Sequence, residues 1–526
     1  MTTGLSSLPA LALLAVAGTA AAQEKVILAH YMPWYETPEI SGRWGEHWTG
    51  FNDEADPTQI GPDGRRDIWS NYYPLIEPYD SRDPDLLECH LLQMKLAGID
   101  GVIVDWYGLS NAADYPEIHT ASRAMFSAAG DMGMKFVAMF EDRTVELLVN
   151  TNQLQPSQIT THLTQTFQWV AANWFSQPHY HRVNGQPLFM NFGPIFVNDP
   201  APWNTAFAAL PEDPQFHALH NLWTGINADG AFMWVHPDIY NGNPSPATIK
   251  QRLNNLYFSV SGDPAKVIPS VCPNFDDVYI PGGLFPPIDD RGGQTFQEAL
   301  EVAMDGPWET IQLVTWNDSG EGTIIEPSRE FGYTYLEMLQ DARRAEQGAA
   351  FTFTADDLRL PATLYALRKE GTTPGATLDQ IAASLTVGDT DEARAQIALL
   401  TGEFFESGPS SAVTDEGGVL TFAAELVTGV SPIGLTWTKD GVAIVDDARV
   451  SGANTTTLTI SPAEASDNAT YQLTVDIGGL MDSTATAVGA VRVEAGGDPA
   501  DLDGNSVVDV FDLIAFLQAF SQALGN

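Results

Sequence analysis

The sequence predicts an α/β protein whose main domain is a (β/α)8 barrel, followed by smaller modules. Three observations support this prediction. Short apolar runs recur from Lys25 to about Arg344, with helix-compatible stretches between them. The runs are apolar on both faces, as strands of a covered parallel sheet are. Polar and aromatic residues follow the runs at their C-terminal ends, the face of such a barrel that carries its active site.

Seven of these runs are candidate strands, and the eighth strand of the barrel is not located in the sequence. The stretch 83–98 has the pattern of a helix between two of them. Alternation of this kind over about 320 residues favours a closed barrel over an open sheet. The runs are VILAHY (26–31), GVIVDWYG (101–108), KFVAMFED (135–142), PLFMNFG (187–193), AFMWVHP (231–237), KVIPSVCPNF (266–275) and TIQLVTWND (310–318).

Composition limits the possible functions. The 526 residues include 24 Lys plus Arg against 68 Asp plus Glu, a formal net charge of −44. Such a chain repels phosphate backbones and anionic lipid heads, so nucleic acid is excluded as a partner. With 44% hydrophobic and 17% charged residues, the chain is globular rather than disordered. Cys89 and Cys272 both lie in apolar sequence, which predicts buried thiols.

The first 22 residues are expected to be a signal peptide. Their apolar run is too short to span a bilayer and ends in small residues, Ala20–Ala22, before Gln23. No Lys or Arg precedes the run, which departs from the usual pattern. We therefore expect a protein that is secreted, periplasmic or at the cell surface. No later segment has the length and apolar character of a membrane span.

Two modules are expected after a barrel domain at 23–345. Residues 346–404 alternate helix-like patterns with glycine-containing breaks, which predicts a small helical appendage. Residues 405–496 show short alternating runs broken by turn residues, which is typical of a β-sandwich. Trp437, with Asp467 followed by Tyr471, resembles the buried tryptophan and tyrosine corner of the immunoglobulin-like fold. Leu473 stands where that fold often has a cysteine.

The C-terminal segment 497–526 has the spacing of a twelve-residue calcium loop, followed by the apolar run FDLIAFLQAF. It resembles dockerin modules, which implies Ca2+ binding and docking onto a cohesin-like or cell-surface partner. Ser506 occupies the usual glycine position and only one loop is present, which leaves an attachment tag and a chance acidic tail as alternatives. The expected ligands are Asp501, Asp503, Asn505, Val507 through its carbonyl, Asp509 and Asp512.

Two carboxylates lie three residues apart on a glycine-containing loop after the last apolar run. Asp318 and Glu321 are both able to point into the mouth of a barrel. Hydrolysis of a glycosidic bond uses such a pair, one protonated and one ionised. The spacing by itself is equally typical of a solvated loop or a helix cap.

Several separated segments resemble glycoside hydrolases of the family 71 and 99 type. They are HYMPWY (30–35), GEHW (45–48), YYPLIEPYDSRDP (72–84), MKLAGIDGVIVDWYG (94–108) and TWNDSGEGTIIEP (315–327). The resemblance implies a (β/α)8 enzyme that cleaves α-1,3-glucan or α-mannan without a cofactor for catalysis. It places Asp318 and Glu321 on the two catalytic carboxylates. Family 99 has Glu at the first position, so retention through the sugar's 2-hydroxyl and inversion through water both remain open for Asp318.

The remaining site residues are expected to bind sugar. Glu141 matches a family 99 glutamate, and Asp105, Trp106 and Tyr107 lie where that family has aromatic subsite residues. Each of these residues also has an alternative, structural role. Asp105 and Glu141 could form an ion pair with Arg143. His30 and Tyr31 could make hydrogen bonds at the barrel rim, and His236 could be a packing residue. The substrate-binding set is His30, Tyr31, Trp34, Asp105, Trp106, Tyr107, Glu141, His236, Trp316, Asn317 and Glu326.

The sequence therefore predicts a secreted glycoside hydrolase that cleaves an α-linked polysaccharide, with Glu321 as general acid and Asp318 as base or assistant. The chain lacks an HExxH motif, a phosphate-cradling glycine loop and a GxSxG elbow. The alternative hypothesis is a non-catalytic carbohydrate-binding or surface-display protein on the same scaffold.

Overall fold

The computed structural model describes residues 24–279, 285–477 and 483–492. The chain divides into two compact units. The first contains the residues up to Arg82 and 97–352, and the second contains 83–96 and the residues from Phe353 onward. The predictions for the signal peptide and for the calcium loop fall outside the described residues.

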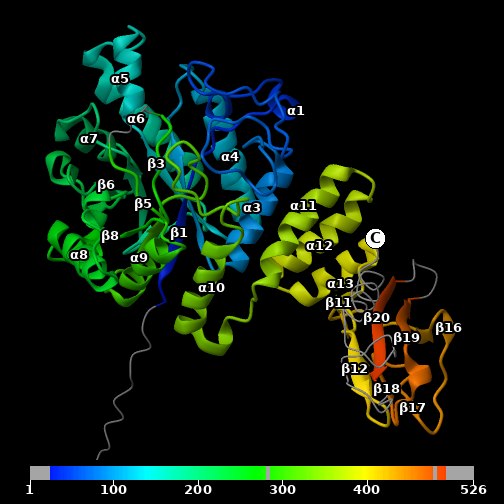
Figure 1. Ribbon diagram of the computed structural model, residues 1–526. Helices are drawn as coiled ribbons and strands as arrows, with labels where there is room; N and C mark the ends of the chain where they lie inside the picture. Colours follow the sequence, from blue (N-terminus) through cyan, green and yellow to red (C-terminus); the bar gives the residue numbers. More distant parts are fainter. Residues whose placement is uncertain (1–23, 280–284, 478–482, 493–526) are drawn as a thin grey trace, which may run out of the picture. The chain divides into compact units, whose positions relative to one another are not determined.

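The first unit is built on a parallel barrel (Figure 1). Its sheet runs in the order β8-β7-β6-β5-β3-β2-β1-β10-β9. Only Pro269 separates β8 from β9, and its carbonyl accepts a 3.0 Å hydrogen bond from the amide of Gln312, so the two form one interrupted strand. β8 pairs with β7 and β9 pairs with β10, which closes the barrel. The predicted barrel fold is confirmed. The strands are β1 Val26–Tyr31, β2 Gly101–Trp106, β3 Lys135–Phe140, β5 Gln186–Asn191, β6 Gln215–Leu219, β7 Gly230–Phe232, β8 Val267–Ile268, β9 Ser270–Val271 and β10 Thr310–Leu313.

β6 is the strand that the sequence did not reveal. His217 lies in the middle of its five residues and interrupts the apolar run. Burial lowers the pKa of His217 to about 4, so a neutral imidazole takes the place of an aliphatic side chain. β6 pairs with β5 and β7 in parallel and fills the gap in the predicted strand order.

Helices alternate with the strands and cover the outside of the barrel. Additional short elements lie in the loops, among them β4 Arg182–Val183, which pairs with β5 in antiparallel fashion. The helices of this unit are α1 Pro38–Ser41, α2 Glu46–Thr49, α4 Tyr115–Asp131, α5 Arg143–Asn150, α6 Ile159–Val170, α7 Pro200–Phe207, α8 Pro246–Val260, α9 Gln294–Asp305 and α10 Thr334–Gln347.

The second unit begins with α3 Pro84–Leu96, which the chain enters between β1 and β2. α3 packs on α11 Leu360–Glu370, which is followed by α12 Gly375–Val387 and α13 Thr390–Thr401. The guanidinium of Arg368 in α11 binds both carboxylate oxygens of Glu88 in α3, at 2.7 and 3.0 Å. Lys369 forms ion pairs of 2.6 and 2.7 Å with Asp83 and Asp85.

The rest of the second unit is a β-sandwich with two main sheets, β12-β20-β19-β15-β16 and β13-β18-β17. Trp437 is fully buried between them and Tyr471 stacks on Phe422. The hydroxyl of Tyr471 donates a 3.0 Å hydrogen bond to the carbonyl of Asp467, which is the predicted tyrosine corner. The strands are β11 Phe405–Ser407, β12 Ala412–Asp415, β13 Leu420–Ala423, β14 Glu425–Leu426, β15 Gly434–Lys439, β16 Val442–Ala443, β17 Val450–Ser451, β18 Thr457–Ile460, β19 Ala469–Asp476 and β20 Ser483–Arg492.

Candidate active site

Asp318 and Glu321 lie on a tight loop after β10. The amide of Asp318 donates to the hydroxyl of Thr315 at 2.8 Å, and the amide of Glu321 donates to Oδ1 of Asp318 at 2.9 Å. The amide of Gly322, at φ 66°, donates to the carbonyl of Asp318 at 3.0 Å. The hydrogen bonds within this loop hold both carboxyls at the C-terminal end of the barrel.

The two carboxyls have different environments. Burial raises the pKa of Glu321 well above its usual range, and the neighbouring charge of Asp318 raises it further. The indole nitrogen of Trp234 donates a 3.1 Å hydrogen bond to Oε2 of Glu321 and opposes this rise. Burial raises the pKa of Asp318 to about 6. The amide of Glu321, the nearby His47 and the hydroxyl of Tyr279 oppose this rise. At neutral pH the site therefore holds a protonated Glu321 beside an ionised Asp318.

A second pair of acids lies at the ends of β2 and β3. Asp105 is 2% exposed, and burial with the charges of Glu141 and Asp318 raises its pKa well above the usual range. Burial raises the pKa of Glu141 to about 7, which Arg143 opposes from 3.6 Å. The charge of Glu141 is among the causes that raise the pKa of Asp105, so Asp105 keeps its proton beside Glu141.

Asn317 and Glu326 belong to the framework beneath the loop. Oδ1 of Asn317 accepts from the amide of Met32 at 2.8 Å, and its Nδ2 donates to the carbonyl of Met32 and to the hydroxyl of Tyr79. The hydroxyl of Tyr79 in turn donates to Oε2 of Glu326 at 2.7 Å. These contacts tie the loop to the segment after β1.

Tyr35 provides a second attachment of the catalytic loop. Its hydroxyl donates to the carbonyl of Asn317 at 2.7 Å and accepts from the amide of Ser319 at 3.1 Å. Its amide donates to the hydroxyl of Ser81 at 3.0 Å. The segment after β1 and the residues before α3 therefore hold the loop jointly.

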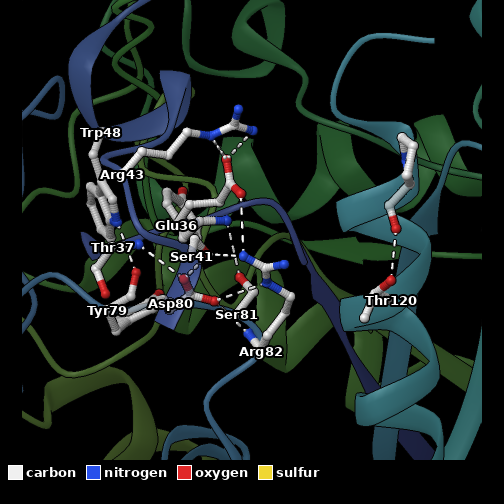
Figure 2. A network of polar contacts seen from close by, with 12 residues as sticks. Glu36, Thr37, Ser41, Arg43, Trp48, Tyr79, Asp80, Ser81, Arg82 and Thr120 are labelled. Carbon is white, nitrogen blue, oxygen red and sulfur yellow. Dashed lines mark hydrogen bonds and ion pairs between the residues drawn. The ribbon is translucent and has the colours of Figure 1, made fainter. Parts of the chain in front are cut away.

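A polar network connects these two segments (Figure 2). The amide of Thr37 donates to Oδ2 of Asp80 at 3.0 Å, and Arg82 reaches Asp80 and, at 3.4 Å, Glu36. Glu36 also accepts two hydrogen bonds from the guanidinium of Arg43, at 2.9 and 3.0 Å. The network fixes the position of Tyr35 through its neighbours in the chain.

Three histidines that lie at or after the ends of barrel strands have buried ring nitrogens without a hydrogen-bond partner. Both ring nitrogens of His30 are buried without a hydrogen-bond partner, as are Nδ1 of His220 and Nε2 of His236. Burial lowers the pKa of His30 and of His236 to about 3, so both rings are neutral. The ring of His30 meets that of Trp234 edge-on at 4.8 Å. Neutral imidazoles that lack partners are suited to hydrogen-bond the hydroxyls of a ligand.

Four of the predicted aromatic residues occupy different environments. Trp34 stacks at 4.2 Å on His47, which acts on the charge of Asp318, and Tyr107 follows Asp105 in the chain and stacks on Tyr115 at 4.8 Å. Tyr31 and Trp316 are fully buried. Trp34 and Tyr107 are therefore less deeply buried than Tyr31 and Trp316 and remain candidates for contact with a sugar ring.

Trp106 is not part of the group. It is fully buried, its indole nitrogen donates to Nδ1 of His119 at 3.1 Å, and it packs on Phe140, Trp169 and Trp174. Since Asp105 faces the barrel interior, the alternation of a strand directs Trp106 toward the covering helices.

Three residues of the site were missed in the sequence: Trp234, Tyr279 and His47. Trp234 follows β7, so the rule that selected the other strand ends also applies to it. Tyr279 donates to Oδ1 of Asp318 at 3.3 Å from a loop that has no recognisable pattern. His47 lies in the segment GEHW, and its Nε2 is 3.6 Å from Oδ2 of Asp114.

Within the described ranges, no cluster of three or more His, Cys, Asp or Glu has the arrangement of a metal site. None of the helices in that part of the chain has the length and apolar character that crossing a bilayer requires.

The model of glycosyl hydrolase family 99 matches residues 22–214, and that of the immunoglobulin I-set domain matches residues 403–487. The mouse glycoprotein endo-alpha-1,2-mannosidase is 24% identical over 349 residues, which cover 59% of this chain and 70% of the relative. A human glycoprotein endo-alpha-1,2-mannosidase-like protein is 23% identical over 354 residues, covering 59% and 71%. The solved GH99 endo-alpha-mannosidase from Bacteroides thetaiotaomicron aligns with a TM-score of 0.47 at 19% identity, over 63% of this chain and 100% of that one.

The matching family model and the curated relatives identify the chain as a glycoside hydrolase. Its N-terminal part is similar to glycosyl hydrolase family 99 over residues 22–214, and an immunoglobulin-like domain follows. The family 99 match ends before Asp318 and Glu321, so the roles of these two residues depend on the geometry of the loop.

Proposed function

We propose that the barrel hydrolyses internal linkages of an α-mannan, with Glu321 as general acid and Asp318 as the base or assistant. The observation that supports this assignment is the contrast between the two carboxyls of one loop. Glu321 keeps its proton at neutral pH while the pKa of Asp318 is about 6. Two titratable groups whose environments separate their pKa values are the usual acid and base of a glycosidase.

In this mechanism Glu321 donates its proton to the glycosidic oxygen as the C–O bond breaks. The hydrogen bond from Trp234 to Oε2 fixes the carboxyl and stabilises the carboxylate that forms. Asp318 accepts the proton of the attacking nucleophile, which is either a water molecule or the 2-hydroxyl of the sugar itself. The first route inverts the anomeric configuration, and the second gives net retention.

The names of the relatives support the substrate class. Several of them are endo-alpha-1,2-mannosidases or endo-alpha-1,2-mannosidase-like proteins. The unpartnered nitrogens of His30 and His236 are suited to the hydroxyl-rich surface of a neutral sugar.

The test is incubation of the full chain with α-1,2-linked mannan, other α-mannans and α-1,3-glucan, with product anomers followed by NMR. Glu321→Gln is expected to lower turnover by about a hundredfold to ten-thousandfold while binding is retained. Asp318→Asn is expected to cause a loss of similar size. The first anomer that the wild type forms identifies the nucleophile: an inverted anomer indicates water, and a retained anomer indicates the 2-hydroxyl. Equal turnover by wild type and Glu321→Gln would contradict the assignment.

We also propose that the chain is exported and that its C-terminal loop binds Ca2+. The apolar run before Gln23 and the oxygen ligands from Asp501 to Asp512 support these two proposals. N-terminal sequencing of the exported protein tests the first. Calorimetric titration with Ca2+ of the full chain and of Asp501→Ala/Asp503→Ala tests the second, and equal heats from both would contradict it. We expect the C-terminal segment to bind a cohesin-like or cell-surface partner.

A further inference from the structure

The segment that contains Tyr279 lies directly on the catalytic loop. The amide of Val278 donates to the carbonyl of Gly320 at 2.8 Å, and the amide of Asp276 donates to the carbonyl of Glu321 at 2.9 Å. Gly320 permits this approach, because a Cβ at that position would lie 1.9 Å from the ring of Tyr279. The backbone therefore brings the phenol of Tyr279 against the loop that carries both carboxyls.

The hydroxyl of Tyr279 donates to Oδ1 of Asp318 at 3.3 Å. The amide of Glu321 donates to the same oxygen at 2.9 Å. Two donors on one carboxylate oxygen define the orientation of the group, because rotation about χ2 would break both hydrogen bonds. Both hydrogen bonds are made to Oδ1, which leaves Oδ2 as the oxygen for the reacting group.

Neighbouring rings hold Tyr279 in place independently of its hydroxyl. Phe51 stacks on it at 5.8 Å with an interplanar angle of 17°, and Trp69 meets it edge-on at 5.2 Å. The ring of His47 lies at 6.5 Å, also edge-on. Removal of the hydroxyl alone therefore leaves the packing of the ring intact.

We propose that Tyr279 is a positioning residue of the reaction, whose hydroxyl orients Asp318 and keeps that carboxyl in its charged form, with Oδ2 toward the substrate. This inference rests on the proposed role of Asp318.

The charge of Asp318 depends on groups from four parts of the barrel. Glu321 lies on its own loop, Asp105 on β2, Tyr35 after β1 and His47 on α2. Burial favours the protonated form of Asp318, while the donors and His47 favour the charged form. Loss of the Tyr279 hydroxyl removes one of the donors that favour the charged form, so Asp318 is protonated more readily.

The direct test is an NMR titration of the full chain labelled with 13C at the aspartate carboxyl, in which Asp318→Asn assigns the signal of Asp318. Tyr279→Phe is expected to raise the pKa of Asp318 from about 6 by about half a pH unit or more. Tyr257→Phe is the matched control, because the hydroxyl of Tyr257 donates at 2.7 Å to the carbonyl of Ser270 in the core. An unchanged titration of Asp318 in Tyr279→Phe overturns the inference.

The kinetic test is the pH profile of kcat/KM. In Tyr279→Phe the acidic limb is expected to move upward with the titration, and kcat is expected to fall about tenfold with little change in KM. A uniform fall at every pH without displacement of the limb indicates a structural role and overturns the inference. If the wild type hydrolyses none of the substrates, the proposed function fails, while the NMR titration still tests the hydrogen bond.

Discussion

Trp234 binds the proposed acid directly, because its indole nitrogen lies 3.1 Å from Oε2 of Glu321. The same ring meets His30 edge-on at 4.8 Å and Phe192 at 4.8 Å. Strand ends β1, β5 and β7 therefore contribute to the surroundings of one carboxyl, although they lie far apart in the sequence.

Trp234→Phe keeps a ring at this place and removes the donor. The hydrogen bond lowers the pKa of Glu321, so its loss is expected to move the alkaline limb of kcat/KM to higher pH. We expect kcat/KM to fall about tenfold, because the carboxyl also loses its orientation. Trp308→Phe is the control, since Trp308 is buried against Tyr257 and Phe258. A Trp234→Phe profile that coincides with that of the wild type would argue against this contact.

The wild-type pH profile is itself a prediction. Asp318 acts in its ionised form and its pKa is about 6, so kcat/KM is expected to fall tenfold per pH unit below that value. The raised pKa of Glu321 leaves the alkaline side active well above neutrality. Initial rates from pH 4 to 10 on a neutral mannan measure both limbs. An acidic limb near pH 4 would be the ordinary value of an exposed carboxyl and would contradict the burial effect.

The free energy of unfolding is expected to fall as pH rises, because of the buried carboxyl of Asp105. Its pKa is raised in the folded state, so the folded protein binds the proton more tightly than the unfolded chain does. The free energy of unfolding therefore falls as pH rises above the unfolded value of about 4, toward the raised folded value. Asp105→Asn removes this term, and we expect its Tm to exceed that of the wild type by about 2 °C or more at pH 7. Thermal unfolding at pH 4 and pH 7 checks the sign, because the difference should vanish at the lower pH.

The barrel domain is expected to need the helices after it. Glu88 and the apolar side of α3 are bound by Arg368 and the rest of α11, so α3 loses its partners when α11 is absent. A chain that ends at residue 345 should be poorly soluble or should unfold at a lower temperature. A chain that ends at residue 404 keeps α11 to α13 and should match the full chain in Tm. Equal stability of the two truncated chains would contradict this dependence.

The prediction of the barrel succeeded where strands are continuous apolar runs. β1, β2 and β3 are buried along nearly their whole length and end in the polar residues that were expected at the active face. β6 was missed because His217 is neutral and buried, and a buried histidine cannot be distinguished by composition from an exposed one. The closing strand was predicted as one run, whereas Pro269 divides it into β8 and β9.

The site was predicted less completely than the fold. Asp318 and Glu321 share a loop, so their proximity is a local property that the sequence contains. Tyr279 approaches Asp318 from 39 positions away through a turn that has no pattern. Trp106, by contrast, was predicted to bind sugar but packs away from the site. Its neighbour Asp105 faces the barrel interior, and successive residues of a strand face opposite sides.

The grouping of Asp105, Glu141, Asp318 and Glu321 is expected to disfavour anionic polymers, because Asp318 is ionised at neutral pH even though Asp105 and Glu321 keep their protons. The only cation paired with any of them in the described residues is Arg143, which is 56% exposed, and the whole chain carries a net charge of −44. We expect a polysaccharide with sulfate esters or uronic acids to be repelled both at the surface and at the C-terminal end of the barrel, whereas a neutral chain is not repelled. We expect sulfation of an otherwise cleavable mannan to lower kcat/KM, and added salt to restore part of the loss by screening.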